Sequence, residues 1–417
     1  MRILRLTSRL EEKILGARHR HNARAEAVSS RIVRDVRRRG DAALFRWTRR
    51  LDDVRLTPRK LWVSASERRQ GSRAVPKELR EALEHAARNI RRVAEEQLPR
   101  SWSVEVERGV RVSQRVAPID TIGCYIPGGR FSLVSTLLMT AIPAQVAGVR
   151  RIVVACPRPN AALLAVAEML GLEEIAHIGG AQAIAAFAYG TRSVPRVDKI
   201  CGPGNRFVTA AKRLVSGDCA IDMLAGPTEL LVVAASGNPE YIAADLVAQA
   251  EHDPDAIALL VTTSRKLAER VRKAVGEQLA DLPEANPAKR SLPEKGGIIL
   301  APDSGAAIRF ANRFAPEHLS IPGAEAKMAE KLEAAGSVFV GPWSAQSIGD
   351  YASGTNHVLP TSGGARTRGG LSTWDFVRCT TVQQVTPAGL RSLSPVVAAL
   401  ADAEGLVAHR RAVEVRR

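Results

Sequence analysis

Four short segments of this chain each place a histidine within a few residues of a carboxylate or an amide. They read Gln249-Ala-Glu-His252, Ala-Pro-Glu317-His318, Gly-Asp350 through Asn-His357, and Glu404-Gly-Leu-Val-Ala-His409. Such clusters suit a divalent metal ion with a general base beside it. The other four histidines, at positions 19, 21, 85 and 177, stand among arginines or alanines and have no such neighbours.

The first two segments each have a chemical and a plainer interpretation. Gln249 and His252 are spaced i, i+3 in a stretch of helical character, so one helix face could hold an ion. Alternatively, His252 is a polar residue at a helix end. Glu317 and His318 are adjacent, so that one can take a proton while the other orients it or activates water. Alternatively, they form a solvated pair on a loop.

The two later segments are equally open when each is taken alone. Asp350 and His357 flank a run of small residues, where a carboxylate and an imidazole could both face a cleft. Asp350 could instead cap a helix. His409 lies near the C-terminus, where a histidine is usually solvated.

The composition bounds the class of protein. The chain has 417 residues, 45% of them hydrophobic, which is enough for two or three domains. No apolar run reaches about 18 residues, and the N-terminus lacks the pattern of a signal peptide, so we expect no membrane span. Five scattered cysteines argue against a disulfide framework and favour the cytoplasm.

The net charge of +17 raises the alternative of a nucleic-acid-binding protein. The basic residues are spread along the chain, however, and aromatic residues are only 4%, too few for stacking platforms. We therefore expect no nucleic-acid partner. A thiol nucleophile is a further alternative, but Cys156 ends an apolar strand, where packing is the more common role.

The order of apolar segments predicts parallel sheets. Strands expected at 151–156, 175–178 and 199–201 are each followed by a helix, which implies right-handed crossovers. A second such unit begins at 229. Residues 1–100 read as helical, 104–112 as a strand pair around a turn at Gly109, 282–293 as a surface loop, and 385–417 as one or two helices. The strands expected in the second unit are 230–234, 256–262, 297–300 and 338–340, with a helix at 267–282.

Glycine turns lie between strand and helix at Gly179–Gln182 and Gly202–Asn205. A helix N-terminus at such a turn offers free N–H groups to an anion such as a pyrophosphate. The usual Gly-x-Gly-x-x-Gly fingerprint is absent, and glycine turns in α/β units are often structural. The turn at Tyr125–Gly129 is similar. The glycine turns therefore have two interpretations, a nucleotide-binding role and a purely structural one.

Taken together and in order, these segments resemble the histidinol dehydrogenase family from about Ser29 to Arg416. The resemblance rests on eight segments of the sequence: Tyr125-Ile-Pro-Gly-Gly, Gly180-Ala-Gln-Ala-Ile-Ala-Ala, Val197-Asp-Lys-Ile-Cys-Gly-Pro-Gly-Asn, Ile221-Asp-Met-Leu-Ala-Gly-Pro-Thr-Glu, Gln249-Ala-Glu-His, Ala315-Pro-Glu-His, Gly349-Asp-Tyr-Ala-Ser-Gly-Thr-Asn-His-Val-Leu-Pro and Glu404-Gly-Leu-Val-Ala-His. The resemblance implies oxidation of L-histidinol to L-histidine in two NAD-dependent steps through a bound aldehyde, the last step of histidine biosynthesis.

The resemblance also assigns expected roles. His318 would be the general base of both oxidations and Glu317 would activate water for the second. One Zn²⁺ per subunit would fix the substrate's imidazole and amine. The family is a homodimer whose C-terminal tail reaches the partner's site. By position, the expected metal ligands are Gln249, His252, Asp350 and His409; the NAD contacts are Tyr125, Gln182 and Asn205; and the substrate contacts are Thr228, Gln249, His252, His318, Asp350, His357, Glu404 and His409.

One residue departs from the family pattern. The family commonly has Gly-Pro-Ser-Glu where this chain has Thr228, which keeps the hydroxyl but adds a methyl group to the pocket. A paralogous zinc- and NAD-dependent dehydrogenase of another small alcohol, such as a sulfonated diol, is the alternative function. Retention of Glu404 favours histidinol. A basic protein that has lost catalysis is a second alternative, and it would be expected to lack a ligand or the base.

The expected fold is α/β, with two related Rossmann-like parallel-sheet domains and small helical extensions at both ends. The expected boundaries are a helical extension at 1–22, a first α/β domain at 23–124 plus 233–371 carrying the zinc and catalytic residues, an NAD-binding domain at 125–232, and a helical tail at 372–417 that reaches the partner subunit.

Overall fold

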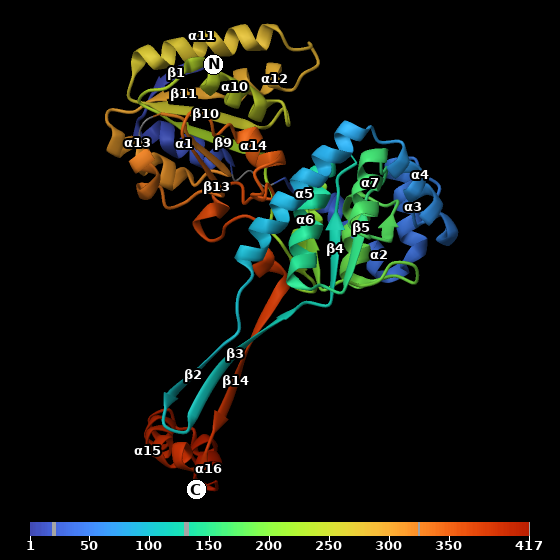
Figure 1. Ribbon diagram of the computed structural model, residues 1–417, viewed down its shortest axis with the longest axis vertical. Coiled ribbons are helices and arrows are strands. Elements are labelled where there is room, and N and C mark those ends of the chain that lie inside the picture. Colours follow the sequence, from blue (N-terminus) through green and yellow to red (C-terminus); the bar gives the residue numbers. More distant parts are fainter. Residues whose placement is uncertain (19–21, 129–132, 324–325, 417) are drawn as a thin grey trace.

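The computed structural model of the chain describes residues 1–18, 22–128, 133–323 and 326–416. His19, His21 and the last glycine of the turn expected at 125–129 lie outside these ranges. Two α/β bodies lie side by side, and a long arm extends away from them to a pair of helices at the C-terminus (Figure 1). Within the described ranges, no helix combines the length and the apolar character that crossing a membrane requires.

The first body is built on a six-stranded parallel sheet. Its order is β1 (Arg2–Arg5), β11 (Gly297–Leu300), β10 (Ile257–Thr262), β9 (Glu229–Val233), β12 (His318–Ile321) and β13 (Ser337–Val340). Side chains of β9 alternate between two cores, because successive residues of a strand point to opposite faces. Leu230 and Val232 pack against α10 (Pro239–Ala250), α11 (Arg265–Ala280) and α12 (Ala288–Glu294); Leu231 and Val233 pack against α1 (Ser8–Arg18) and α13 (Ser304–Phe314).

The second body is built on a five-stranded parallel sheet. Its order is β6 (Glu174–Ala176), β5 (Arg151–Ala155), β4 (Thr121–Tyr125), β7 (Lys199–Cys201) and β8 (Ala220–Ile221). Helices bury both faces, as parallel sheets require. On one face lie α5 (Lys77–Gln97), α6 (Val134–Ala147) and α7 (Ala161–Met169), with α4 (Ala65–Arg73) packed on α7; on the other lie α2 (Ala23–Arg39), α3 (Asp41–Asp52), α8 (Gly180–Tyr189) and α9 (Arg206–Val215).

The two sheets share one topology. The order β6-β5-β4-β7-β8 in the smaller sheet repeats as β11-β10-β9-β12-β13 in the larger one. In both, the chain starts at a central strand, adds two strands on one side, and then crosses to the other side. The reversal falls between β4 and β7 and between β9 and β12. The prediction of two related α/β units is therefore confirmed.

The arm is an antiparallel sheet of three strands in the order β14 (Val377–Val385), β3 (Val110–Pro118) and β2 (Trp102–Glu107). The turn at Gly109 confirms the predicted strand pair. Helices α15 (Pro387–Ala403) and α16 (Val407–Glu414) close the arm at its far end (Figure 1). The remaining elements are α14 (Gln346–Tyr351) and the short helices η1 (Pro58–Lys60), η2 (Ala326–Lys331), η3 (Gly364–Arg366) and η4 (Thr373–Phe376).

Several expectations need correction. The loop expected at 282–293 contains most of α12, which forms because Ala288 and Leu292 are buried. The terminal extensions are not purely helical: 1–22 contributes β1 and 372–417 contributes β14. The expected boundaries placed α2–α5 in the zinc-binding domain. These helices pack instead on the helices that cover the five-stranded sheet, because their apolar side chains are buried against α6 to α9.

The central strand β4 yields a stability test at Gly123. A methyl group there would lie 2.6 Å from Cδ2 of the fully buried Phe187, which has no room to move. We expect Gly123→Ala to lower the free energy of unfolding by about 1–3 kcal/mol in urea denaturation, the cost of overpacking. Gly276→Ala, in the exposed interior of α11 with open space around it, should raise the same free energy by about 1 kcal/mol. Equal effects of the two changes would contradict the packing argument.

Candidate functional site

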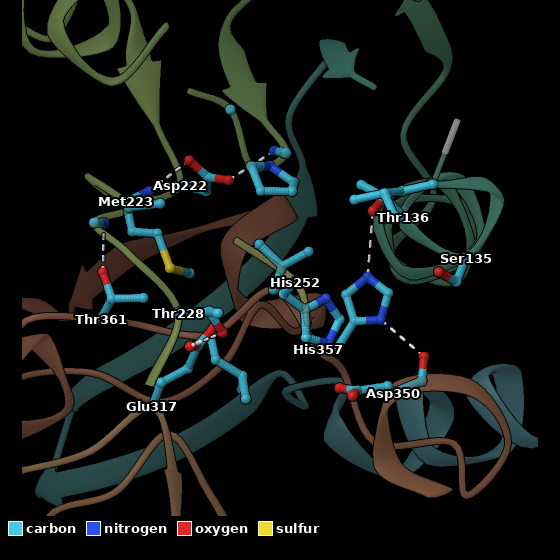
Figure 2. A pocket seen from close by; sticks show the side chains of 18 of the residues that line it. Ser135, Thr136, Asp222, Met223, Thr228, His252, Glu317, Asp350, His357 and Thr361 are labelled. Carbon is cyan, nitrogen blue, oxygen red and sulfur yellow. Dashed lines mark hydrogen bonds between the residues drawn. The ribbon is translucent and has the colours of Figure 1, made fainter. Parts of the chain in front are cut away.

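A pocket lies between the carboxyl edge of the five-stranded sheet and the amino edge of the six-stranded sheet (Figure 2). The five-stranded body contributes the turn after β7 and the residues after β8, and α6 contributes its first turn. The six-stranded body contributes the residues at the starts of β9 and β12. The lining includes Ser135, Thr136, Gly202, Pro203, Gly204, Lys212, Asp222, Met223, Thr228, His252, Glu317, His318, Asp350, His357 and Thr361. The structure thus brings segments from both bodies to one cavity.

Glu317 and His318 form the buried centre of this pocket, with 7% and 3% of their surfaces exposed. Oε2 of Glu317 accepts hydrogen bonds from the Thr228 hydroxyl at 2.6 Å and from the backbone N–H of Glu229 at 2.7 Å. Nδ1 of His318 lies 3.1 Å from the Glu229 carbonyl oxygen. A carbonyl only accepts, so the proton sits on Nδ1. The other nitrogen, Nε2, has no hydrogen-bond partner and is 3.5 Å from the Asp350 carboxylate.

The charge around His318 favours its protonated form. Burial by itself lowers the pKa of His318, but the carboxylates of Glu317 and Asp350 outweigh burial and raise the pKa to about 10. A general base must be unprotonated at its working pH. A cation beside Asp350 would oppose the effect of the two carboxylates and favour the neutral form of His318.

Asp350 also organises the far side of the pocket from α14. Its backbone carbonyl accepts from Nδ1 of His357 at 2.8 Å, which leaves Nε2 of His357 3.3 Å from the Thr136 hydroxyl. Burial lowers the pKa of His357, so its neutral form is favoured. One carboxylate oxygen of Asp350 accepts from the Gln346 amide at 2.8 Å. Burial acts to raise the pKa of Asp350, but the adjacent His318 and the nearby His357 and His252 outweigh burial and lower the pKa.

Two of the four expected metal ligands, His252 and Asp350, line this pocket, and a third, Gln249, contacts the lining residue Thr228. The Gln249 amide donates to Thr228 at 2.5 Å, and its buried oxygen has no partner. His252 follows α10 by two residues and lines the pocket, near enough to Asp350 to affect its charge. An unpartnered amide oxygen, an imidazole and a carboxylate are donors that zinc accepts. Among the residues that the structure describes, no three His, Cys, Asp or Glu side chains converge as a metal site. The three residues thus fit zinc as an incomplete set.

The chain does not bring Glu404 and His409 to its own pocket. Glu404 follows α15 and His409 lies in α16, and both are exposed at the end of the arm (Figure 1). The arm holds these helices away from both α/β bodies. The fourth expected ligand is therefore missing from the site that its own chain forms.

The residues expected to contact NAD lie at the carboxyl edge of the five-stranded sheet. The Tyr125 hydroxyl accepts from the backbone N–H of Gly180 at 3.1 Å. The Gln182 amide donates to Asp52 at 2.9 Å and keeps a buried, unpartnered oxygen. Asn205 is exposed and caps α9 through Phe207 N–H at 2.9 Å. None of the three belongs to the described lining of the pocket.

The sequence reasoning missed the support of the turn after β7. The buried Lys212 ammonium pairs with Asp222 and donates to the Gly202 carbonyl at 2.9 Å. Asp222 accepts in turn from the Gly202 N–H at 2.7 Å. Both polar groups of Gly202 are thereby fixed. Asp222 belongs to the family-like segment that begins at Ile221, but nothing in that segment indicates that Asp222 pairs with Lys212 and holds Gly202.

The cysteines behave as packing residues. Cys156 is fully buried, and burial raises its pKa to about 11. None of the five cysteines, all of which the structure describes, lines the pocket. The packing interpretation of Cys156 is thus favoured over a thiol nucleophile.

Comparisons with known proteins agree on one family. The pattern of the family described as Histidinol dehydrogenase matches residues 16–417. A histidinol dehydrogenase of Methanothermobacter thermautotrophicus is 48% identical over 386 residues, covering 91% of this chain and 90% of that protein. One from Photobacterium profundum is 46% identical over 400 residues, covering 94% and 90%.

A solved structure of a histidinol dehydrogenase has the same fold as this chain. The crystal structure of histidinol dehydrogenase from Elizabethkingia anophelis superposes with a TM-score of 0.94 at 37% identity, covering 100% of this chain and 98% of that one. The likeness spans both α/β bodies and the arm. This chain therefore belongs to the histidinol dehydrogenase family, and its reaction is the NAD-dependent oxidation of L-histidinol to L-histidine that ends histidine biosynthesis.

Proposed function

We propose that the pocket around Glu317 and His318 carries out both oxidations, with L-histidinal held between them. The observation that carries this proposal is the adjacency of two buried proton-handling groups that are anchored separately. An alcohol oxidised to an acid delivers two hydrides, with water added to the aldehyde between them. The full-length match to histidinol dehydrogenases favours this substrate over another small alcohol.

His318 is the proposed base of both steps. In the first, Nε2 takes the hydroxyl proton while the carbon gives a hydride to NAD⁺. In the second, it takes a proton from the hydrated aldehyde while a second hydride leaves. The Glu229 carbonyl fixes the tautomer by holding the Nδ1 proton, so the free nitrogen is the one at the pocket. The two hydrides, each passed to one NAD⁺, carry away the four electrons removed from the alcohol. His318 releases each proton that it takes up to solvent, so that it is unprotonated again for the next step.

Glu317 is the proposed activator of the water that adds to the aldehyde. The Thr228 hydroxyl and the Glu229 N–H both donate to Oε2 and so hold the carboxylate in one orientation. Thr228 is part of this arrangement, because its hydroxyl donates to Glu317 and accepts from Gln249. We propose that Thr228 organises these two side chains in addition to contacting substrate. Its extra methyl group narrows the pocket without costing the hydroxyl bond.

Zinc is the proposed metal, held by Gln249, His252 and Asp350 with His409 of a second copy. When bound, it would supply a fixed point for the substrate's imidazole and amine. Support comes from the unpartnered oxygen of Gln249 and from the charge that Asp350 brings to the pocket. The proposed substrate contacts around this point are Thr228, Gln249, His252, His318, Asp350, His357, Glu404 and His409.

A homodimer is the proposed functional unit, with the arm of each subunit reaching the other's pocket. Exposed apolar side chains on the arm helices support it: Leu400 is 61% exposed and Val407 is 73% exposed. With Val396, Leu406 and Val415, they give the two arm helices an exposed apolar surface of the kind that a partner chain covers. NAD is proposed to bind at the reversal between β4 and β7, near Tyr125, Gln182 and Asn205, because ligands bind at such reversals in open α/β sheets. A biosynthetic role that consumes NAD suits the cytoplasm, the compartment that we propose.

The first test separates the two steps. We expect two NADH per L-histidinol from the wild type. Glu317→Gln keeps an oxygen for both donors but loses the charge, so it should slow aldehyde oxidation by about two to four orders of magnitude and leave alcohol oxidation less affected. Stopped-flow measurement of each step from alcohol and from aldehyde is the readout, with the exposed Glu333→Gln as control. Equal slowing of both steps would refute the assigned role.

The second test concerns the metal. Elemental analysis should find one zinc per subunit, and X-ray absorption should show nitrogen and oxygen neighbours without the sulfur distance of about 2.3 Å. Asp350→Asn should weaken zinc binding in a chelator competition, since it removes the only charged ligand. Full activity after exhaustive chelation, with metal loss verified, would contradict the proposed zinc requirement.

The third test asks whether His409 acts across the dimer. His318→Ala and His409→Ala, each inactive, are mixed and allowed to exchange subunits. In a mixed dimer, one site combines the intact His318 of one chain with the intact His409 of the other. Activity should recover to about a quarter of wild type, because half of the dimers are mixed and each has one working site of two. No recovery, with exchange confirmed by mass tags, would place His409 in its own subunit's site.

A further inference from the structure

Arg18, the last residue of α1, is an arginine buried beneath the catalytic pair. Its side chain is 1% exposed. The guanidinium binds the Glu229 carboxylate with both prongs, Nε to Oε1 at 2.6 Å and Nη2 to Oε2 at 2.5 Å. A two-pronged bond of this kind fixes orientation as well as distance. Neither Arg18 nor Glu229 is among the described residues that line the pocket.

The same guanidinium also holds the end of α13. Nη1 donates to the Phe314 carbonyl, Nη2 lies 3.5 Å from the Ala315 carbonyl, and the group stacks 3.7 Å above the Phe314 ring. Carbonyls in the last turn of a helix have no partner within the helix. Ala315 ends the helix in the left-handed region, with φ +45°, which a residue with a side chain rarely adopts. Arg18 therefore supports a constrained turn two residues before Glu317.

Both segments that Arg18 holds lead directly to the catalytic side chains. The backbone N–H of Glu229 donates to Glu317, and its carbonyl accepts from His318. A displacement of Glu229 would therefore move the partners of both residues at once. A displacement of the turn at Ala315 would move the start of β12, which carries His318.

We propose that Arg18 is a positioning residue, which sets the geometry of Glu317 and His318 by clamping the starts of β9 and β12 together. This inference rests on the proposed roles of that pair. Arg18 touches neither substrate nor cofactor, so its loss should lower kcat and leave KM nearly unchanged. Because it serves both residues, alcohol and aldehyde oxidation should fall by similar factors.

Three variants test the clamp. Arg18→Lys keeps the charge but loses the two-pronged geometry. Arg18→Met leaves the buried Glu229 carboxylate unpaired and is expected to destabilise the chain. The double variant Arg18→Met with Glu229→Met removes both charges and should recover the melting temperature, since apolar replacement of a buried pair is tolerated. Arg313→Met is the matched control: it also joins α13 to α1, through Glu11 at 3.2 Å, but it is 59% exposed and does not contact Glu229.

We expect Arg18→Lys and the double variant to lower kcat of both oxidations by roughly tenfold to a hundredfold, the scale of a small misplacement of reacting groups. KM for histidinol and NAD should stay within about twofold, and Arg313→Met should match wild type. Wild-type kcat in a double variant with recovered stability would overturn the clamp, as would a loss confined to KM. Failure of Glu317→Gln to separate the two steps would refute the roles of the pair and not the clamp, which slows both steps alike.

Discussion

The backbone of Glu229, at the first position of β9, is the point on which the proposed catalytic arrangement depends. Its N–H holds the Glu317 carboxylate and its carbonyl holds Nδ1 of His318. Glu317 precedes β12 and His318 is its first residue, and each side chain has its own hydrogen-bonding partner on Glu229. Parallel pairing of β9 and β12, with His318 opposite Leu230, brings the N–H and the carbonyl of Glu229 within reach of the two side chains.

The duplicated topology explains how one fold supplies two kinds of chemistry. In the five-stranded sheet the reversal between β4 and β7 opens at the carboxyl edge, where glycine turns and helix N-termini can approach an anionic ligand. In the six-stranded sheet the pocket lies at the opposite, amino edge, where side chains at the starts of β9 and β12 converge. The carboxyl edge of the five-stranded sheet, where we propose that NAD binds, therefore faces the amino edge of the six-stranded sheet, which carries Glu317 and His318. This arrangement suits a hydride transfer that is accompanied by removal of a proton.

Sequence reasoning worked where the information is local. The strands at 199–201 and 297–300 fall where the apolar segments predicted them, and a helix follows the first of them as expected. Three of the four histidine segments meet at one pocket, and Glu317, His318, Asp350 and His357 stand within those short motifs. What was missed depends on distant partners. Strand β1 forms only because β11, nearly 300 residues later, offers an edge, and β14 forms along β3. Arg18 has no motif around it, and its burial follows from a carboxylate 211 residues away.

The charge balance of the pocket connects three proposed properties. Glu317 and Asp350 raise the pKa of His318, and a cation beside them would favour the neutral form that the proposed base requires. The compensating cation requires ligands, and one of the proposed four lies at the end of an arm that cannot reach its own pocket. Association would therefore complete the metal site, and the metal would release the base, because binding energy at a shared site is coupled to assembly. On this proposal, an isolated subunit would lack the cation that favours a neutral His318, although Glu317 and His318 are already held by the backbone of Glu229.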